Sequence, residues 1–460
     1  MQRSDSNRRR RRKPVKGYKI NYPRLIISLM ITMIILWGSF KIVSGAVGFV
    51  VRTVKGAGNK VEITVENKDI NIEINNKEQE YINKPEESEK KAEPEKTEAK
   101  SEKTVKRPEE TKSITIAATG DVLYHFGMIN AGYNAATEAY DFTDHYEKVK
   151  DLISGADLAL ANFEGTMAQE LLPLAAYPLF NAPDAVATAL SYAGFDALCT
   201  ANNHCLDSGV EGIESTINAI NFNNMKHFGT KKQPGDNLLV IEKNGIKIGL
   251  LAYSELFNGL DENLSEENSY MISRMDLNVI ESDIKSAKQS GCDLVAVYAH
   301  WGHEYVFEQT QTQTDVAHMM IEWGADLILG SHPHVLQKTE IVKHEGLDKF
   351  IIYSMGNAIS NQRRETIDNK YTETGVILKF SIEKNNENTL IKSVEMYPTW
   401  VNSFLDVNGN RKFELLNTQD FIEGGKYRDT VNEETLERIL DARDYALKIL
   451  NGESYPQTGN

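Results

Sequence analysis

The feature that most limits the possible folds is an alternation of short apolar runs with helix-like segments, which begins near residue 114. We expect strands at 114–118, 158–161, 195–199, 238–241, 246–253, 294–299, 327–329, 350–353, 375–382 and 390–397. We expect helices at 183–193, 209–221, 277–289, 314–323 and 433–450. The pair at 238–253 is predicted to be antiparallel because Asn244-Gly245 is a hairpin turn signal. Strands alternating with helices indicate an α/β domain with a layered sheet.

Polar side chains gather where the apolar runs end. They are Asp121 with His125, then Glu164, then Asn203 with His204 and Asp207, then His300 with His303, and finally His332 with His334. The carboxyl ends of strands in open α/β sheets are where ligands bind. Buried carboxylates and imidazoles cost free energy unless they are paired or metal-bound. The pattern therefore favours a metal site over the alternative, a purely structural polar network.

The mixture of ligand types indicates which ions would fit. Imidazole, carboxylate and amide groups without an obligatory thiolate suit Mn, Fe, Zn or Mg rather than a structural zinc site. Enough ligands are present for two divalent ions, which together can activate a water molecule and clamp a leaving oxygen. The three cysteines, Cys199, Cys205 and Cys292, do not make a disulfide framework. Cys205 is interpreted as a bystander in its loop, and Asn202 as a turn residue.

The N-terminal part of the chain differs in composition from the rest. Residues 1–24 form a basic tail with ten Lys/Arg and one acidic residue, and residues 25–51 are mostly apolar. This length suits a membrane helix that stays uncleaved, and the alternative is a cleaved signal peptide. Residues 52–113 are rich in Lys, Glu, Pro and Ser and are predicted to be a largely disordered extracellular stalk. The main domain is expected at 114–400, and a C-terminal extension with a helix that packs on it at 401–460.

The distribution of charge predicts the orientation of the chain in the membrane and argues against nucleic acid as a partner. The chain has 51 Lys/Arg and 66 Asp/Glu, so the part after residue 24 carries a net charge of -24. A domain this acidic is a poor candidate for nucleic acid. Basic residues ahead of a first apolar helix keep that side cytoplasmic. We expect a single-pass protein of the cell membrane with a cytoplasmic N-terminus and an extracellular main domain.

Six motifs in order resemble one known family, the CapA proteins of capsule and poly-γ-glutamate biosynthesis. The motifs are Gly120-Asp121-Val122, Asn162-Phe163-Glu164-Gly165, Thr200-Ala201-Asn202-Asn203-His204, His300-Trp301-Gly302-His303-Glu304, Gly330-Ser331-His332-Pro333-His334-Val335-Leu336-Gln337 and Tyr353-Ser354-Met355-Gly356-Asn357. The resemblance runs from about residue 114 to 361. The family is similar to calcineurin-like metallophosphoesterases, which implies a four-layer α/β/β/α sandwich.

The resemblance also implies roles for single residues. Asp121, His125 and His334 would hold a first metal ion, and Glu164 would bridge to a second, at a position where the superfamily has Asp. Asn203, His300 and His332 would hold the second ion. His204 would be the proton donor, with Asp207 orienting it. Glu304 would orient His300, Asn162 and Asn357 would support the ligands from outside, and His303 is expected to be exposed.

Three functions compete at this point. The first is a membrane-anchored, metal-dependent hydrolase or transferase that acts on a phosphoester or amide bond of an anionic envelope polymer. The second is a non-catalytic factor that binds this polymer within a complex of membrane proteins for synthesis and export. The third is a generic extracellular metallophosphodiesterase. The sequence alone does not choose among them.

Overall fold

The computed structural model describes residues 111–386 and 388–452. The basic tail, the predicted membrane helix and nearly all of the predicted stalk therefore lie outside the described residues. Within the described ranges, no helix is both long and apolar enough to span a bilayer.

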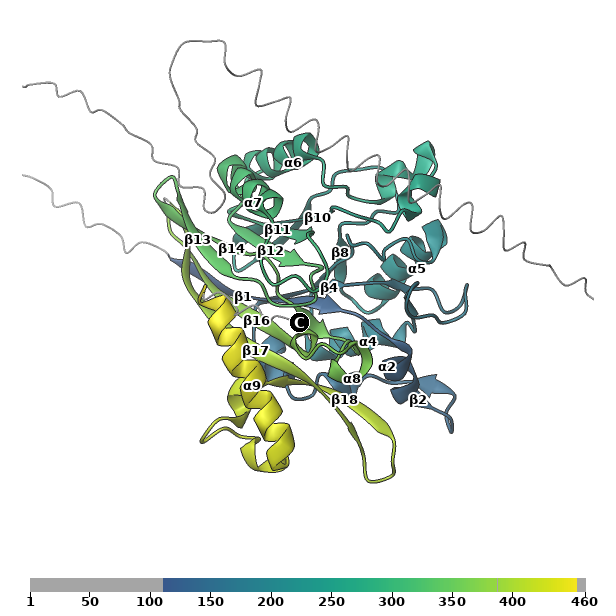
Figure 1. Ribbon diagram of the computed structural model, residues 1–460. Helices are drawn as coiled ribbons and strands as arrows, with labels where there is room; N and C mark the ends of the chain where they lie inside the picture. The colour runs from purple at the N-terminus through teal and green to yellow at the C-terminus, as the bar shows by residue number, and fades with distance from the viewer. Residues whose placement is uncertain (1–110, 387, 453–460) are drawn as a thin grey trace, which may run out of the picture. The chain divides into compact units, whose positions relative to one another are not determined.

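Two β-sheets form the centre of the described part of the chain (Figure 1). The first sheet has the strand order β18-β17-β16-β1-β4-β7-β8, with β15 also paired to β1. Its strands are β1 Lys112–Val122, β4 Leu158–Phe163, β7 Ala197–Cys199, β8 Lys226–Phe228, β15 Asn357–Ile359, β16 Thr374–Lys384, β17 Thr389–Leu405 and β18 Arg411–Asn417. Strands β1, β4, β7 and β8 are parallel, whereas β16, β17 and β18 pair in antiparallel fashion.

The second sheet has the order β13-β14-β12-β11-β10-β9. Its strands are β9 Leu239–Lys243, β10 Ile246–Ser254, β11 Leu294–His300, β12 Leu327–Ser331, β13 Thr339–His344 and β14 Leu347–Ile352. Strands β10, β11, β12 and β14 are parallel, and the two edge strands are antiparallel to their neighbours.

Helices cover the outer faces of the two sheets, whereas the last helix packs against the core between them. The helices are α2 Phe126–Ala131, α3 Lys150–Ser154, α4 Ala185–Ala193, α5 Gly209–Phe222, α6 Leu277–Gln289, α7 Gln311–Trp323, α8 Arg364–Ile367 and α9 Glu433–Leu450. Along β1 the side chains alternate, so that Ile116 packs between the sheets while Ala117 packs with α4 on the outer face. Helices α6 and α7 bury residues such as Ile284 and Met320 against the second sheet. The order of layers is helix, sheet, sheet, helix.

The mixed α/β class expected from the sequence is confirmed. The antiparallel pair β9–β10 is also present, and its turn residues Asn244 and Gly245 have the positive φ that such a turn needs. Helix α7 begins three residues earlier than expected, and β13 and β18 were not predicted. Strand β17 crosses the expected boundary at residue 400, so residues 401–417 continue the first sheet.

This topology places the polar strand ends together. Asp121 near the end of β1 pairs in register with Asn162 of β4, and His300 of β11 pairs with Ser331 of β12. Parallel strands end at the same edge of a sheet. Because the sheets pack face to face, the polar ends of one sheet meet those of the other.

Candidate metal centre

Five side chains from the strand ends converge on one point. Ligand atoms of Asp121, Glu164 and His334 lie within 4.8 Å of one another, and so do those of Glu164, His300 and His332. All five residues are buried, and Glu164 belongs to both groups. The arrangement offers two neighbouring pockets of ligand atoms that share a carboxylate.

The loop after β12 is held in an uncommon backbone conformation. His332 has φ 95° and His334 has φ 57°, which is the left-handed region that residues with a Cβ rarely adopt. The backbone N–H of His332 donates to Asp121 Oδ2 at 3.2 Å, which ties this loop to the first sheet. Strained backbone of this kind gathers at functional sites. Here the strained residues are His332 and His334 themselves, and each belongs to one of the two ligand groups that contain Glu164.

Glu164 lacks the partners that a buried carboxylate needs. Neither of its oxygens has a hydrogen-bond partner, although the side chain is fully buried. Its Oε1 lies 3.7 Å from His334 Nε2 and 3.9 Å from His300 Nε2, which is too long for hydrogen bonds. Burial raises the pKa of Glu164 well above its ordinary value. A cation between these groups would supply the missing partner, so the residues present fit a metal ion.

The pKa values of the candidate histidine ligands shift in opposite directions. Burial, followed by the neighbouring His334, lowers the pKa of His332 to about 3. Burial and His332 lower the pKa of His300 well below its usual value. In His334 burial acts to lower the pKa, but the carboxylates of Glu164 and Asp121 outweigh it and raise the pKa to about 9. Neutral imidazole is the form that binds metals, and His334 stands where positive charge is favoured.

His204, which the sequence predicts to be a proton donor, is paired with Asp207. His204 Nδ1 lies 2.7 Å from Asp207 Oδ2, and the same oxygen accepts the backbone N–H of Phe180 at 2.5 Å. The Phe180 ring packs edge-on against His204, with 4.7 Å between ring centroids. His204 Nε2 lies 4.0 Å from Glu164 Oε1. The free nitrogen of His204 is therefore near the metal-ligand groups.

Three asparagines contact the ligands directly. Asn162 Nδ2 donates to Asp121 Oδ1 at 2.8 Å. Asn357 Oδ1 lies 3.0 Å from His334 Nδ1, and Asn203 Oδ1 lies 2.8 Å from His300 Nε2. The structure thus places Asn162, Asn203 and Asn357 against three of the candidate ligands.

Two expectations from the sequence differ from the structure. His125 lies outside both ligand groups, with its ring against Phe180 at 5.0 Å. Glu304 is exposed, and among the described residues no hydrogen bond joins it to His300. The hydroxyl of Ser331, 3.0 Å from His300 Nδ1, takes the place that was assigned to Glu304. His303 is exposed.

Sequence reasoning also missed the importance of Asn202. Asn202 is a turn residue, as expected, but it is also fully buried and donates to Phe163 O at 2.7 Å and Asn162 Oδ1 at 3.3 Å. Its Oδ1 accepts the backbone N–H of His204 at 3.2 Å. The signal was available in principle, because two adjacent amides that directly follow a buried strand seldom both face solvent.

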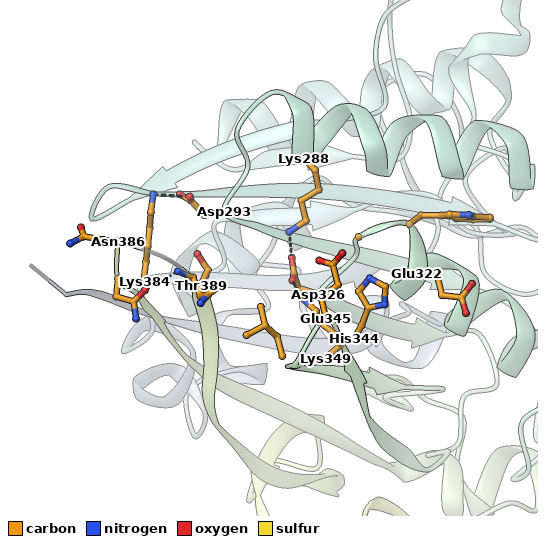
Figure 2. A pocket seen from close by; sticks show the side chains of 15 residues that line it. Lys288, Asp293, Glu322, Asp326, His344, Glu345, Lys349, Lys384, Asn386 and Thr389 are labelled. Atoms are coloured by element: carbon orange, nitrogen blue, oxygen red, sulfur yellow. Dashed lines mark hydrogen bonds and ion pairs between the residues drawn. The ribbon is translucent and has the colours of Figure 1, made fainter. Parts of the chain in front are cut away.

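A second charged site lies at the opposite ends of the strands (Figure 2). It is a surface hollow of about 580 Å³ in which Lys288 contacts Asp326 at 2.6 Å, Lys349 contacts the same carboxylate at 2.5 Å and Lys384 contacts Asp293 at 2.7 Å. These charges satisfy one another. We therefore interpret the charged residues of this hollow as a structural ion-pair network and not as a second reactive site.

Two packed sheets between helices, with carboxylate, amide and imidazole groups at the strand ends, define an α/β protein with a candidate metal centre. The chain belongs to the family described as bacterial capsule synthesis protein PGA_cap, which matches residues 115–362. This confirms the family resemblance seen in the motifs.

Two curated relatives are similar over part of their length. The capsule biosynthesis protein CapA of Bacillus anthracis is 28% identical over 260 residues, which cover 55% of this chain and 61% of that protein. The PGA biosynthesis protein CapA of Bacillus subtilis (strain 168) is 29% identical over 195 residues, which cover 42% of this chain and 48% of that protein. The chain thus spans about half to three fifths of these relatives.

Solved structures show a more distant similarity. The calcineurin-like phosphoesterase YfkN of Bacillus subtilis is 14% identical with a TM-score of 0.39, covering 74% of this chain and 98% of that chain. The NAD nucleotidase NadN of Haemophilus influenzae is 11% identical with a TM-score of 0.40, covering 73% of this chain and 56% of that chain.

Proposed function

We propose that this protein is a metal-dependent hydrolase or transferase that acts on a phosphoester or amide bond of an anionic cell-envelope polymer, in capsule or poly-γ-glutamate biosynthesis. The observation that carries the proposal is the fully buried Glu164 carboxylate, which has no hydrogen-bond donor and has three imidazoles within 4.0 Å. A purely structural network would satisfy that carboxylate with donors.

Two ions would use different sides of Glu164. Asp121, Glu164 and His334 would hold one, and Glu164, His300 and His332, with Asn203 beside them, would hold the other. Bound divalent ions of this kind supply Lewis-acid chemistry, which polarises the scissile bond and lowers the pKa of water. Mn, Fe, Zn and Mg all suit this ligand set.

The chain itself would deliver the proton to the leaving group. Asp207 accepts the Nδ1–H of His204 and so leaves Nε2 as the reactive nitrogen. When His204 is protonated, Nε2–H can donate to the departing oxygen or nitrogen, and the Asp207 carboxylate stabilises the imidazolium. The Phe180 backbone and ring hold this pair in place.

The substrate and location rest on family and sequence. The names of the two relatives refer to capsule and PGA biosynthesis. Together with the apolar run at 25–51, this supports a membrane-anchored protein with its main domain outside the cell, in contact with other membrane proteins of a synthesis complex. Protease added to intact cells should cleave within residues 77–113 and release the domain. A stalk that is cleaved only after lysis would contradict this placement.

Metal analysis of the purified full-length chain tests the enzymatic proposal. We expect bound Mn, Fe, Zn or Mg in the wild type, loss of metal in Glu164→Ala, and no loss in Glu262→Ala, a change at an exposed carboxylate. A panel of phosphodiesters and γ-glutamyl amides then tests turnover. A chain without bound metal would refute the proposal. A chain with metal but no turnover on either bond type would favour the polymer-binding assembly factor.

A further inference from the structure

The C-terminal helix α9 contacts two loops that border His334, although it lies beyond the residues 115–362 that match the family. In Figure 1 it runs, in yellow, beside β16 and β17. The first loop is residues 360–374, called the support loop here because it contacts Asn357. The second is residues 301–310, called the rim loop, which follows β11.

An ion pair joins α9 to the support loop. Arg438 Nη2 donates to both oxygens of Glu373, at 3.0 and 2.9 Å. The Glu373 side chain is fully buried and also accepts Trp400 Nε1 at 3.0 Å and the backbone N–H of Arg364 at 2.9 Å. A buried carboxylate with this many donors has a single favourable position. The support loop is therefore fixed to the helix at Glu373.

The support loop in turn fixes Asn357. Asn357 Nδ2 donates to the carbonyl oxygen of Thr372, the residue before Glu373, at 2.9 Å. It also donates to Gln362 Oε1 at 3.0 Å. Both N–H bonds of the amide are thus directed to the support loop. The amide oxygen must then face the other way, where it lies 3.0 Å from His334 Nδ1.

A second set of contacts joins α9 to the rim loop. The Tyr445 ring packs on Tyr371 of the support loop, with centroids 4.8 Å apart, and on Phe307 of the rim loop at 6.3 Å. The rim loop also carries Tyr305, whose ring lies 6.1 Å from that of His334. Its hydroxyl accepts Gln362 Nε2 at 3.2 Å. Both loops around His334 are therefore packed against the same helix.

We propose that α9 is a brace for the metal centre, and that Arg438 and Glu373 are positioning residues that act through Asn357 on His334. Asn357 Oδ1, at 3.0 Å, is nearer to His334 Nδ1 than Asp121 Oδ2, at 3.3 Å. With the Asn357 oxygen accepting the Nδ1–H, the imidazole keeps the tautomer that leaves Nε2 for a divalent cation, on the side of Glu164. Without the Arg438–Glu373 pair the support loop can shift and the Asn357 amide can rotate. This inference rests on the proposed function, because it requires that His334 binds a metal ion.

Titration of the metal-free full-length chain with Mn²⁺ tests the brace. Loss of a direct outer partner of a ligand weakens metal affinity about 10- to 100-fold, so we expect this for Asn357→Ala. We expect a smaller loss of affinity, about 3- to 10-fold, for Arg438→Ala and Glu373→Gln, because these residues act on His334 only through Asn357. Glu373→Gln keeps the size of the side chain but has one acceptor oxygen in place of two, so it can serve only one of the Trp400 Nε1–H and Arg364 N–H donors. Lys448→Ala, at an exposed position on the same helix, is the control and should leave affinity unchanged.

A double-mutant cycle separates positioning from general stability. Arg438→Ala should add little to the loss already caused by Asn357→Ala, because both act on the same imidazole. Arg438→Lys, which keeps the charge but not the bidentate geometry, should restore part of the affinity. If Arg438→Ala and Glu373→Gln lower the melting temperature but leave Mn²⁺ affinity at the wild-type value, or if the losses in the cycle are fully additive, the brace is refuted. A wild-type chain that binds no divalent ion would instead refute the proposed function itself, and the brace with it.

Discussion

Two adjacent asparagines at the end of β7 have different tasks. Asn203 faces the second sheet, where its oxygen lies 2.8 Å from His300 Nε2. Asn202 faces back into the first sheet and joins Asn162, Phe163 and His204. One side chain is thus placed to bind a cation, and the other holds the loop that presents His204.

Substitutions at Asn203 and His204 should separate metal binding from proton transfer. Asn203→Ala removes a carbonyl ligand and should lower the metal content. His204→Ala should keep the metal and lower turnover about 10²- to 10⁴-fold, the usual contribution of a general acid. Metal content by elemental analysis and turnover on the same preparations check both. Equal metal loss in the two variants would contradict the assigned roles.

Asn202→Ala should destabilise the fold itself. It leaves the Phe163 carbonyl and the His204 N–H without their partners in a buried place, which costs about 1–3 kcal/mol. Chemical denaturation of the metal-free protein measures this cost. Asn263→Ala, at an exposed position, is the matched control and should change stability by less than about 0.5 kcal/mol. A cost at Asn202 no larger than that of the control would show that its hydrogen bonds are dispensable.

At the scale of elements, helix α7 begins with a capping box. Thr310 Oγ1 accepts the N–H of Gln313 at 3.1 Å, and Gln313 Oε1 accepts the N–H of Thr310 at 2.8 Å. The sequence places the start at residue 314 because the first turn has no apolar residue to begin a periodic pattern. The pattern of Thr followed three residues later by Gln is nevertheless a known start signal.

Thr310→Ala should therefore destabilise the protein by about 1 kcal/mol through the loss of this cap. Thr312→Ala, an exposed position two residues into the same turn, keeps the cap and should be close to neutral. Urea denaturation of both variants measures the difference. Equal effects of the two substitutions would show that the cap does not contribute.

How far the sequence predicts an element depends on how that element is buried. Strands buried on both faces, such as β4, β11 and β12, are continuous apolar runs and were expected close to their observed places. Edge strands β13 and β18 carry charged residues and were missed. Ligands at strand ends were likewise predictable, because the motif and the strand are neighbours in sequence. Asn162 and Asn357, which support two of the ligands, lie in the same motifs and were predicted as well. The contact of Ser331 with His300 was not predicted, because it joins two different strands.

At the scale of the whole molecule, burial of histidine should make stability depend on pH. His145 is packed among aromatic rings, with Tyr124 OH 3.1 Å from its Nδ1 and the Phe413 ring 6.0 Å away. Burial, as the largest effect, lowers the pKa of His145 from 6.5 to about 4. The unfolded chain recovers a pKa near 6.5. Between about pH 4 and pH 6.5, His145 therefore binds a proton in the unfolded state but not in the folded state.

The contribution of His145 to the free energy of unfolding should therefore be largest above pH 6.5 and fall as the pH drops towards 4. His145 alone accounts for about 3 kcal/mol of this fall, because each unit of pKa shift corresponds to about 1.4 kcal/mol. His227, whose pKa burial also lowers to about 4, acts in the same direction. Urea denaturation of His145→Phe with a chelator present, at about pH 7.5 and 4.5, should show a smaller fall than in the wild type. His303→Gln, at an exposed position, is the control and should show the same decrease in the free energy of unfolding as the wild type. If His145→Phe also showed the wild-type decrease, another group would set the pH dependence.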